Sequence, residues 1–299
     1  MRHSVTKHVG SEALAINNTS FRRFLVRLAL HTTAKFFHRD GPCIPVSRHK
    51  ILKKGFSVHL TEAITIHYVA RNTSIPVPKV HCSFLHKNRA YILMERIQGE
   101  TLAAAWRHLS KESLQKIFLQ LKSMIKELRA LQPPLKTGVE SCVGGSLYES
   151  RLPNGTPRFG PFKTIQEFHR WLRDGLDENT RPGDHVSDED ATAIKAMIVK
   201  QDGPWPAPIF THGDLNPFNI LVRGDQIVGI IDWEFSGWYP PYWEYTSAWF
   251  GNVIRSEWQS VICSLLDPYP EEFEMERTRQ DGGENSEVTF GAFLVHRAI

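Results

Sequence analysis

The sequence predicts an α+β fold with two lobes: a small antiparallel sheet with one helix, then a larger, mainly helical lobe. Three observations carry this prediction. Short strand-like runs cluster before residue 96, with one helical repeat among them at 58–71. Long amphipathic stretches follow, beginning at 110–131. A single hairpin pattern returns at 220–231, and 299 residues suffice for one large domain or two lobes.

Composition excludes several classes of protein. Hydrophobic content of 41% and charged content of 23% are ordinary for a globular chain, and a net charge of +4 gives no argument for nucleic-acid binding. No apolar run approaches membrane-spanning length, so no membrane partner is expected. The four cysteines form no C-x-x-C pair, which indicates reduced thiols and a cytoplasmic location. They are Cys43, Cys82, Cys142 and Cys263.

The N-terminal segment is basic. Residues 1–20 are expected to form a flexible leader, and a helix should follow because apolar residues recur at helical spacing. These residues are Phe21, Phe24, Leu25 and Leu28. Glu12 and Asp40 are the only acids among the first forty residues, so a mitochondrial presequence is an alternative. We favour a helix packed on the first lobe, because any basic amphipathic helix imitates a presequence.

The predicted first lobe spans residues 21–95. A strand at 46–54 places Lys53 and Lys54 on opposite faces, so only one of them can point toward a given neighbour. In the helix at 58–71, Glu62 shares an apolar stripe, where a carboxylate needs either a buried partner or a route to solvent. Two further strands, at 80–84 and 90–94, flank a polar turn.

The predicted second lobe spans residues 96–277, and a tail covers 278–299. Ser110 can cap the helix at 110–131, and Gln132-Pro133-Pro134 ends it. Loops and further helices, at 164–176, 188–199 and 256–266, fill the remainder. The aromatic run 238–245 is expected to pack in the core, with lining of a binding site as the alternative.

The stretch 209–234 carries the chemistry. An apolar run stops at Thr211-His212-Gly213-Asp214, and a hairpin of strands at 220–222 and 226–231 separates Asn219 from Asp232. The hairpin should therefore bring Asn219 and Asp232 to the same end as Asp214. Phosphoryl transfer needs a carboxylate to orient a hydroxyl and oxygen ligands for Mg²⁺. A hairpin whose Asp and Asn only cap turns is the alternative.

This pattern resembles a known family. His212-x-Asp214-x4-Asn219 followed by a strand-borne Asp232 is the arrangement of protein kinases. Gly213 stands where those enzymes have Arg, and Trp233-Glu234 where they have Phe-Gly. The stretch is instead similar to the aminoglycoside phosphotransferase and choline kinase family, particularly its fungal aminoglycoside-phosphotransferase-like proteins. The resemblance implies a bilobal protein-kinase-like fold.

The resemblance also implies ATP and Mg²⁺ as cofactors and a role for each site residue. Asp214 would be the catalytic base, supported by His212 in the same loop, and Asn219 and Asp232 would hold the metal. Further upstream, Lys53 would bind phosphates while paired with Glu62. The nucleotide's adenine edge would lie at the join between the lobes, at Met94, Glu95 and Ile97.

The expected function is transfer of the γ-phosphate of ATP to a hydroxyl of a small molecule by a monomer. Residues 41–47 contain one glycine and two prolines rather than a glycine-rich loop, so a nucleotide-binding pseudokinase is an alternative. A protein kinase-like regulatory protein is another, although no A-P-E segment follows Asp232. A non-enzymatic interaction protein is a third. The acceptor is not specified, although Glu234, Glu244 or the acidic tail could attract a polycation.

Overall fold

The computed structural model describes residues 8, 10–39, 41–149, 158–177, 187–251 and 256–285. Contacts divide the chain into two compact units. Unit 1 comprises Met1–Leu131 and Asp214–Ser236, and unit 2 comprises Gln132–Gly213 and Gly237–Ile299. The stretch from Asp214 to Asp232 therefore belongs to the same unit as the predicted first lobe. The lobe boundary after residue 95 stays a prediction.

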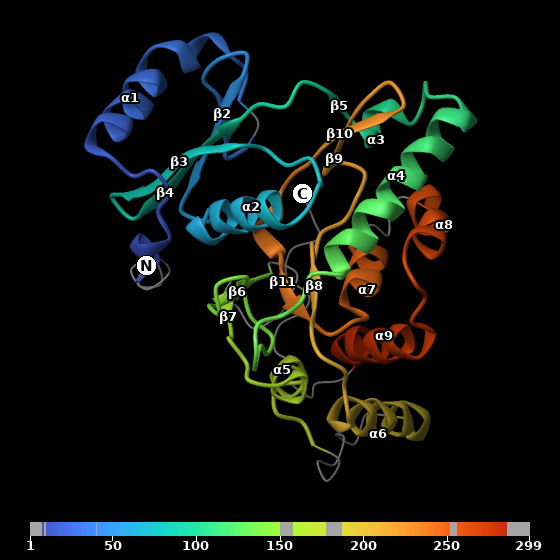
Figure 1. Ribbon diagram of the computed structural model, residues 1–299. Coiled ribbons are helices and arrows are strands. Elements are labelled where there is room, and N and C mark those ends of the chain that lie inside the picture. The colour runs from blue at the N-terminus through green and yellow to red at the C-terminus, as the bar shows by residue number, and fades with distance from the viewer. Residues whose placement is uncertain are drawn as a thin grey trace. The chain divides into compact units, whose positions relative to one another are not determined.

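A four-stranded antiparallel sheet forms the first part of unit 1, in the order β1-β2-β4-β3 (Figure 1). Its strands are β1 (Cys43–Pro45), β2 (Lys50–Gly55), β3 (Val80–His86) and β4 (Arg89–Glu95). Lys87 and Asn88 both have positive φ, as a two-residue hairpin turn between β3 and β4 requires. The sequence did not predict β1, because prolines punctuate it; an edge strand tolerates them.

Two helices cover opposite faces of this sheet. Leu52 is buried in a core cluster with Val26 of α1 (Ser20–His31), whereas the next residue, Lys53, contacts Glu62 of α2 (Leu60–Asn72). Successive residues of a strand point to opposite faces, so the alternation in β2 assigns one helix to each face. Both helices are capped by side chains, α1 by Thr19 and α2 by His59.

Residues 10–19 are part of the fold of unit 1, whereas the sequence predicted a flexible leader over 1–20. Ser11–Leu14 form a short 3-10 helix, η1. Ile16 then exchanges hydrogen bonds with Ser83 of β3, its carbonyl accepting at 2.9 Å and its N–H donating to the Ser83 hydroxyl at 3.0 Å. These pairings fix the entry into α1. A second 3-10 helix, η2 (Thr33–Phe36), follows α1.

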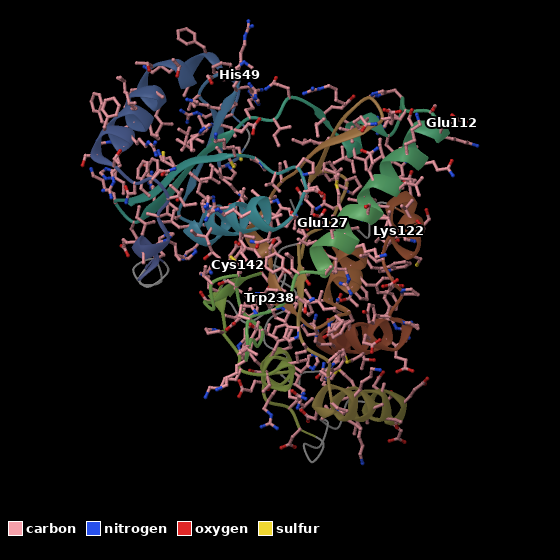
Figure 2. The ribbon with its side chains drawn as sticks, viewed as in Figure 1. His49, Glu112, Lys122, Glu127, Cys142 and Trp238 are labelled. Atoms are coloured by element: carbon pink, nitrogen blue, oxygen red, sulfur yellow. The ribbon has the colours of Figure 1, made fainter. Side chains whose placement is uncertain are left out.

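A second sheet in unit 1 has the order β10-β9-β5. Its strands are β5 (Glu100–Thr101), β9 (Ile220–Arg223) and β10 (Gln226–Ile230), and the short helix α3 (Leu102–Ala105) follows β5. The long helix α4 (Lys111–Arg129) holds the β9–β10 turn through Gln120, which donates to the Asp225 carbonyl and accepts from the Ile227 N–H. Glu127, labelled on α4 in Figure 2, accepts hydrogen bonds from Ser74. The β9–β10 hairpin is thus fixed to a long helix.

Unit 2 is mainly helical. Its helices are α5 (Ile165–Leu172), α6 (Asp188–Asp202), α7 (Trp243–Phe250), α8 (Ser256–Leu265) and α9 (Pro270–Asn285). Two small strand pairs accompany them: β6 (Leu147–Tyr148) with β7 (Arg158–Phe159), and β8 (Ile209–Thr211) with β11 (Gly237–Tyr239).

The aromatic run at 238–245 packs in the core of unit 2, as the sequence predicted. Trp238, labelled in Figure 2, Tyr239, Tyr242 and Trp243 are all buried. Helix α9 extends through residues 278–285, which the sequence analysis assigned to a tail, and the rest of that tail lies outside the described residues. Within the described parts of the chain, no helix combines the length and the apolar character that crossing a bilayer requires.

Candidate active site

The centre of the candidate site is the ammonium group of Lys53. Its Nζ lies 2.9 Å from Glu62, 2.7 Å from Asp232 and 3.2 Å from Glu234. Lys53 is 5% exposed and Glu62 2% exposed, so this ion pair is shielded from water. The predicted partnership of Lys53 with Glu62 is present in the structure. Lys54 points away and lies over the Tyr91 ring at 5.2 Å.

Three carboxylates share this one buried cation. Burial alone would lower the pKa of Lys53, but the charges of Glu62, Asp232 and Glu234 outweigh it and raise that pKa well above its ordinary value. Burial raises the pKa of Glu62 against the attraction of Lys53. Burial also raises the pKa of Glu234, and the charges of Asp232 and Asp214 add to the shift. The cluster therefore carries more negative than positive charge when its acids are ionised.

Asp232 is placed by the hairpin. It lies two residues after the end of β10, in the left-handed conformation with φ of 64°, which is uncommon for a residue with a side chain. At the same end, the N–H of Ile231 donates to the carbonyl of Asn219 at 2.9 Å, so the hairpin joins the two predicted metal ligands. Strained backbone conformations that the surrounding structure maintains cluster at functional sites.

Asp214 and Asn219 form a second cluster in unit 1. The amide nitrogen of Asn219 donates to the Asp214 carboxylate at 2.8 Å and to its carbonyl at 2.9 Å. Asn216 donates to the same carbonyl and accepts from the N–H of Phe218. Asn219 therefore uses its nitrogen to fix Asp214, which leaves its amide oxygen as the atom that could bind a cation.

Glu244 supports the segment just before Asp214, within unit 2. Its carboxylate accepts hydrogen bonds from the N–H groups of His212 at 2.6 Å and Gly213 at 3.1 Å. Gly213 has φ of 83°, a conformation that favours glycine. Glu244 is 1% exposed, so the suggestion that it attracts an acceptor from solvent is wrong. His212 is also buried, and its role in the catalytic loop stays a prediction.

The residues predicted to meet the adenine lie at the end of β4 and just beyond it. Met94 is buried and pairs with Ile51, while Glu95 is exposed and pairs with Lys50. Ile97 is half-buried against Gly229, where an added Cβ would come within 2.5 Å of the Ile97 side chain. Because Ile51 is two residues from Lys53 on β2, Met94 lies on the same part of the sheet as the buried lysine.

The donor groups fit a divalent cation. Oxygen atoms of Glu62, Asp232 and Glu234 all lie within 4.8 Å of one another. The second carboxylate oxygen of Glu62 is buried and, among the described residues, has no hydrogen-bond partner. Carboxylate and amide oxygens are the ligands that Mg²⁺ prefers. The sequence pattern did not assign Glu234 to this cluster, because its contact with Lys53 depends on the left-handed turn at Asp232.

Comparison with known proteins shows which family the chain belongs to. The sequence model of the phosphotransferase enzyme family matches residues 16–277, so the chain belongs to that family. No curated protein sequence matches it significantly. Among solved structures, aminoglycoside phosphotransferase APH(4)-Ia is 18% identical, with a TM-score of 0.56 over 86% of this chain and 88% of that one.

Two nucleotide complexes are also similar in fold. A thermostable variant of APH(4)-Ia, in a ternary complex with AMP-PNP and hygromycin B, is 16% identical, with a TM-score of 0.57 over 90% of each chain. APH(3'')-Id from Streptomyces rimosus, in complex with ADP and streptomycin, is 13% identical, with a TM-score of 0.51 over 88% of this chain and 98% of that one. Family membership confirms the predicted resemblance, the fold class and the small-molecule kinase class.

Proposed function

We propose that the chain transfers the γ-phosphate of ATP to a hydroxyl group of a small molecule, with Asp214 as the catalytic base. One observation carries the proposal: a single hairpin in unit 1 joins the Asp214–Asn219 pair to the Lys53–Asp232–Glu234 cluster. The Ile231–Asn219 hydrogen bond makes that connection, and the charge of Asp214 contributes to the raised pKa of Glu234. A base and a cation site are thereby supported by one element.

Asp214 is suited to orient the acceptor. Its carboxylate is half-buried and held on one oxygen by Asn219, so the group is positioned before an acceptor arrives. It would accept a hydrogen bond from the attacking hydroxyl and take its proton late in the reaction. Because the transition state is loose, positioning contributes more than a shifted pKa, and an ordinary carboxylate suffices.

The remaining acids and Lys53 would serve the nucleotide. Asn219 and Asp232 would hold Mg²⁺, and Glu234 would add a third oxygen ligand. The bound ion would neutralise charge on the phosphate oxygens as it develops. The Lys53 ammonium, kept charged by its acidic neighbours and fixed by Glu62, would bind the phosphates. The end of β4, at Met94, Glu95 and Ile97, would receive the adenine.

The acceptor class is the part of the proposal that needs a screen. Hygromycin B and streptomycin, bound by the structural neighbours, are polycations rich in hydroxyl groups. The excess of carboxylates around Lys53 is compatible with such an acceptor, and a neutral hydroxylated metabolite is the second class to include. ADP release measured over a panel of both classes would identify the acceptor. Nucleotide binding without any ADP release would instead support the pseudokinase alternative.

Two substitutions test the assigned roles. Asp214→Ala should lower turnover by about a thousandfold, the scale of a lost general base, while leaving Mg-ATP binding intact. Asp232→Ala should instead weaken Mg-dependent nucleotide binding, measured by calorimetry with and without chelator. Asp225→Ala is the matched control, because Asp225 lies in the turn of the same hairpin and is paired with Lys116. Turnover preserved in Asp214→Ala would refute the base assignment, and unchanged binding in Asp232→Ala would refute the metal role.

A further inference from the structure

Helix α1 carries two apolar stripes, of which only one is covered. Val26 is buried, and Ala29 and Leu30 pack beside it on the sheet of unit 1. The other stripe is open: Phe21 is 69% exposed, Phe24 61%, Leu25 43% and Leu28 45%. This open stripe, here called the outer stripe, is the one whose spacing predicted the helix. The helix packs on the sheet of unit 1, as expected, but through the other stripe.

The outer stripe is a continuous feature of the helix surface. At 3.6 residues per turn, Phe21, Phe24, Leu25 and Leu28 fall within an arc of about 100°. Figure 1 shows α1 beyond the sheet, with its side chains projecting outward in Figure 2. Phe36, in the following 3-10 helix, is a further open aromatic at 87% exposure. Contiguous exposed apolar surface of this kind marks an interaction site.

Arg22 and Arg27 border the outer stripe, whereas Arg23 lies toward the sheet, over the Phe84 ring at 5.7 Å; acids are missing from the whole segment. Arg22, Arg23 and Arg27 lie on α1, and the sequence contains no Asp or Glu from residue 13 to residue 39. An open hollow of about 500 Å³ lies beside the helix. Its lining joins basic groups to apolar ones, namely Arg23, Arg27, His31 and His86 with Phe24 and Leu28.

The positive charge on this face lowers the pKa values of nearby histidines. Desolvation, together with the charges of Arg27, Lys87 and Arg23, lowers the pKa of His86 on β3. Desolvation and the charges of Lys50 and Lys79 likewise lower the pKa of His81 on the same strand. The face of unit 1 that carries α1 is therefore electropositive as well as apolar, and its ligand must be both anionic and apolar.

We propose that this face docks on a membrane surface containing anionic lipids. The arginine guanidinium groups would bind lipid phosphates, in the planar geometry that Arg offers to such groups. The outer stripe would enter the boundary between headgroups and acyl chains, as exposed apolar faces of basic amphipathic helices do. No membrane partner was expected from the sequence because no segment is long enough to span, but docking of this kind requires no spanning segment.

Two other occupants fit less well. A second copy of the chain would bring Arg22 and Arg27 against the same arginines, with no acid on the helix to offset the repulsion. An acidic protein would need a concave surface shaped to a convex helix, whereas lipid adapts to that helix without a preformed partner surface. The positive charge and the exposed apolar side chains together favour lipid.

Vesicle co-sedimentation of the full chain tests the proposal. Vesicles of phosphatidylcholine with about 30% phosphatidylserine should bind the protein, and phosphatidylcholine vesicles should bind it at least about tenfold more weakly. Phe24→Ser/Leu28→Ser should reduce binding to the anionic vesicles by about tenfold or more, because both side chains are exposed and would enter the lipid. Arg27→Gln, at an exposed position, should reduce it by about fivefold and weaken its salt dependence.

Matched variants on α4 separate docking from general stickiness. Leu119→Ser removes an apolar side chain that is 64% exposed, and Lys111→Gln removes an exposed cation, both in unit 1. Neither should change vesicle binding, and thermal unfolding should be unaltered in every variant. Failure to bind anionic vesicles would overturn the proposal. So would binding that the α1 variants leave unchanged, or self-association in size-exclusion chromatography that those variants abolish without any lipid effect.

Discussion

Lys53 owes its position to the alternation of a single strand. From the sequence, either Lys53 or Lys54 could face α2. Leu52 is buried on the α1 side of the sheet, so its neighbour Lys53 faces α2. The pairing with Glu62 could be predicted because an acid on an apolar helix stripe needs a partner. The contact with Glu234 could not, since it depends on the turn that Asp232 makes in its left-handed conformation.

Removing one member of the buried pair should cost more than removing both. Lys53→Met leaves Glu62 buried without its cation, and we expect a loss of about 3 kcal/mol in the free energy of unfolding at pH 7.5. Lys53→Met/Glu62→Gln should regain most of that loss, because the carboxylate is gone. Both variants should lack turnover. Urea unfolding gives the first comparison and ADP release the second.

The pH dependence of that loss follows from the raised pKa of Glu62. A carboxyl whose folded pKa lies above its unfolded value is favourable at low pH, and the benefit is lost as the pH rises through the folded pKa. Lys53 lowers the pKa of Glu62, so removing it raises that pKa beyond about 8, and the defect of Lys53→Met should grow when unfolding is repeated near pH 9. A defect that is equal at both pH values, or a double variant no more stable than the single one, contradicts this account.

Among the secondary-structure elements, the β9–β10 hairpin is the one whose local pattern made part of the site predictable. The turn residues at 223–225 and the two short apolar runs define the hairpin, and the hairpin brings Asn219 to Asp232. The hydrogen bonds that support the loop before Asp214 could not be predicted from the sequence. Glu244 lies 32 residues from His212 in the chain, and no local pattern connects them. A long-range hydrogen bond to backbone N–H groups leaves no periodic signal.

Glu244 should matter for both folding and turnover. Its two oxygens each accept one N–H, so Glu244→Gln replaces an acceptor by a donor and leaves one buried N–H unpaired. We expect a loss of about 2 kcal/mol in the free energy of unfolding, the scale of a buried hydrogen bond to a charged group. Turnover should fall because Asp214 follows directly, while nucleotide affinity stays near wild type.

An exposed glutamate of unit 2 provides the comparison. Glu257→Gln on α8 makes the same chemical change at an exposed position and should alter neither the denaturation midpoint nor kcat. If Glu244→Gln behaves like Glu257→Gln in both measurements, the carboxylate does not support the loop. Reduced nucleotide affinity without any loss of stability would assign Glu244 to nucleotide binding instead of loop support.

At the scale of the whole molecule, periodicity predicted which helices exist better than which face each one buries. The stripe that predicted α1 is the exposed one, because Val26, Ala29 and Leu30 fill the sheet side instead. Hydrophobic spacing reports that a helix has an apolar side, and a helix with two such sides has no unique orientation from sequence alone. The division into units is similarly non-local, since residues 214–236 group with the first 131 residues across an intervening segment.

A buried histidine in unit 2 sets part of the acid stability of the whole protein. His169 is fully buried, with Nδ1 3.1 Å from the Gln201 carbonyl and Nε2 2.8 Å from the Tyr242 hydroxyl. The carbonyl can only accept, so Nδ1 carries the proton of the neutral ring and Nε2 is left to accept. Burial lowers the pKa of His169 to about 4, because the fold excludes the charged form.

Stability should therefore fall as the solution is acidified, and His169 should account for a defined share. The unfolded chain takes up a proton near pH 6.5 and the folded chain only near pH 4, so the contribution is complete above pH 6.5 and is lost progressively down to about pH 4. The full loss is about 3 kcal/mol. His169→Gln should flatten the dependence of the unfolding free energy on pH in this window, whereas His67→Gln, at an exposed position of α2, should keep the wild-type slope. Equal slopes in all three proteins would show that His169 is not the group that excludes the proton.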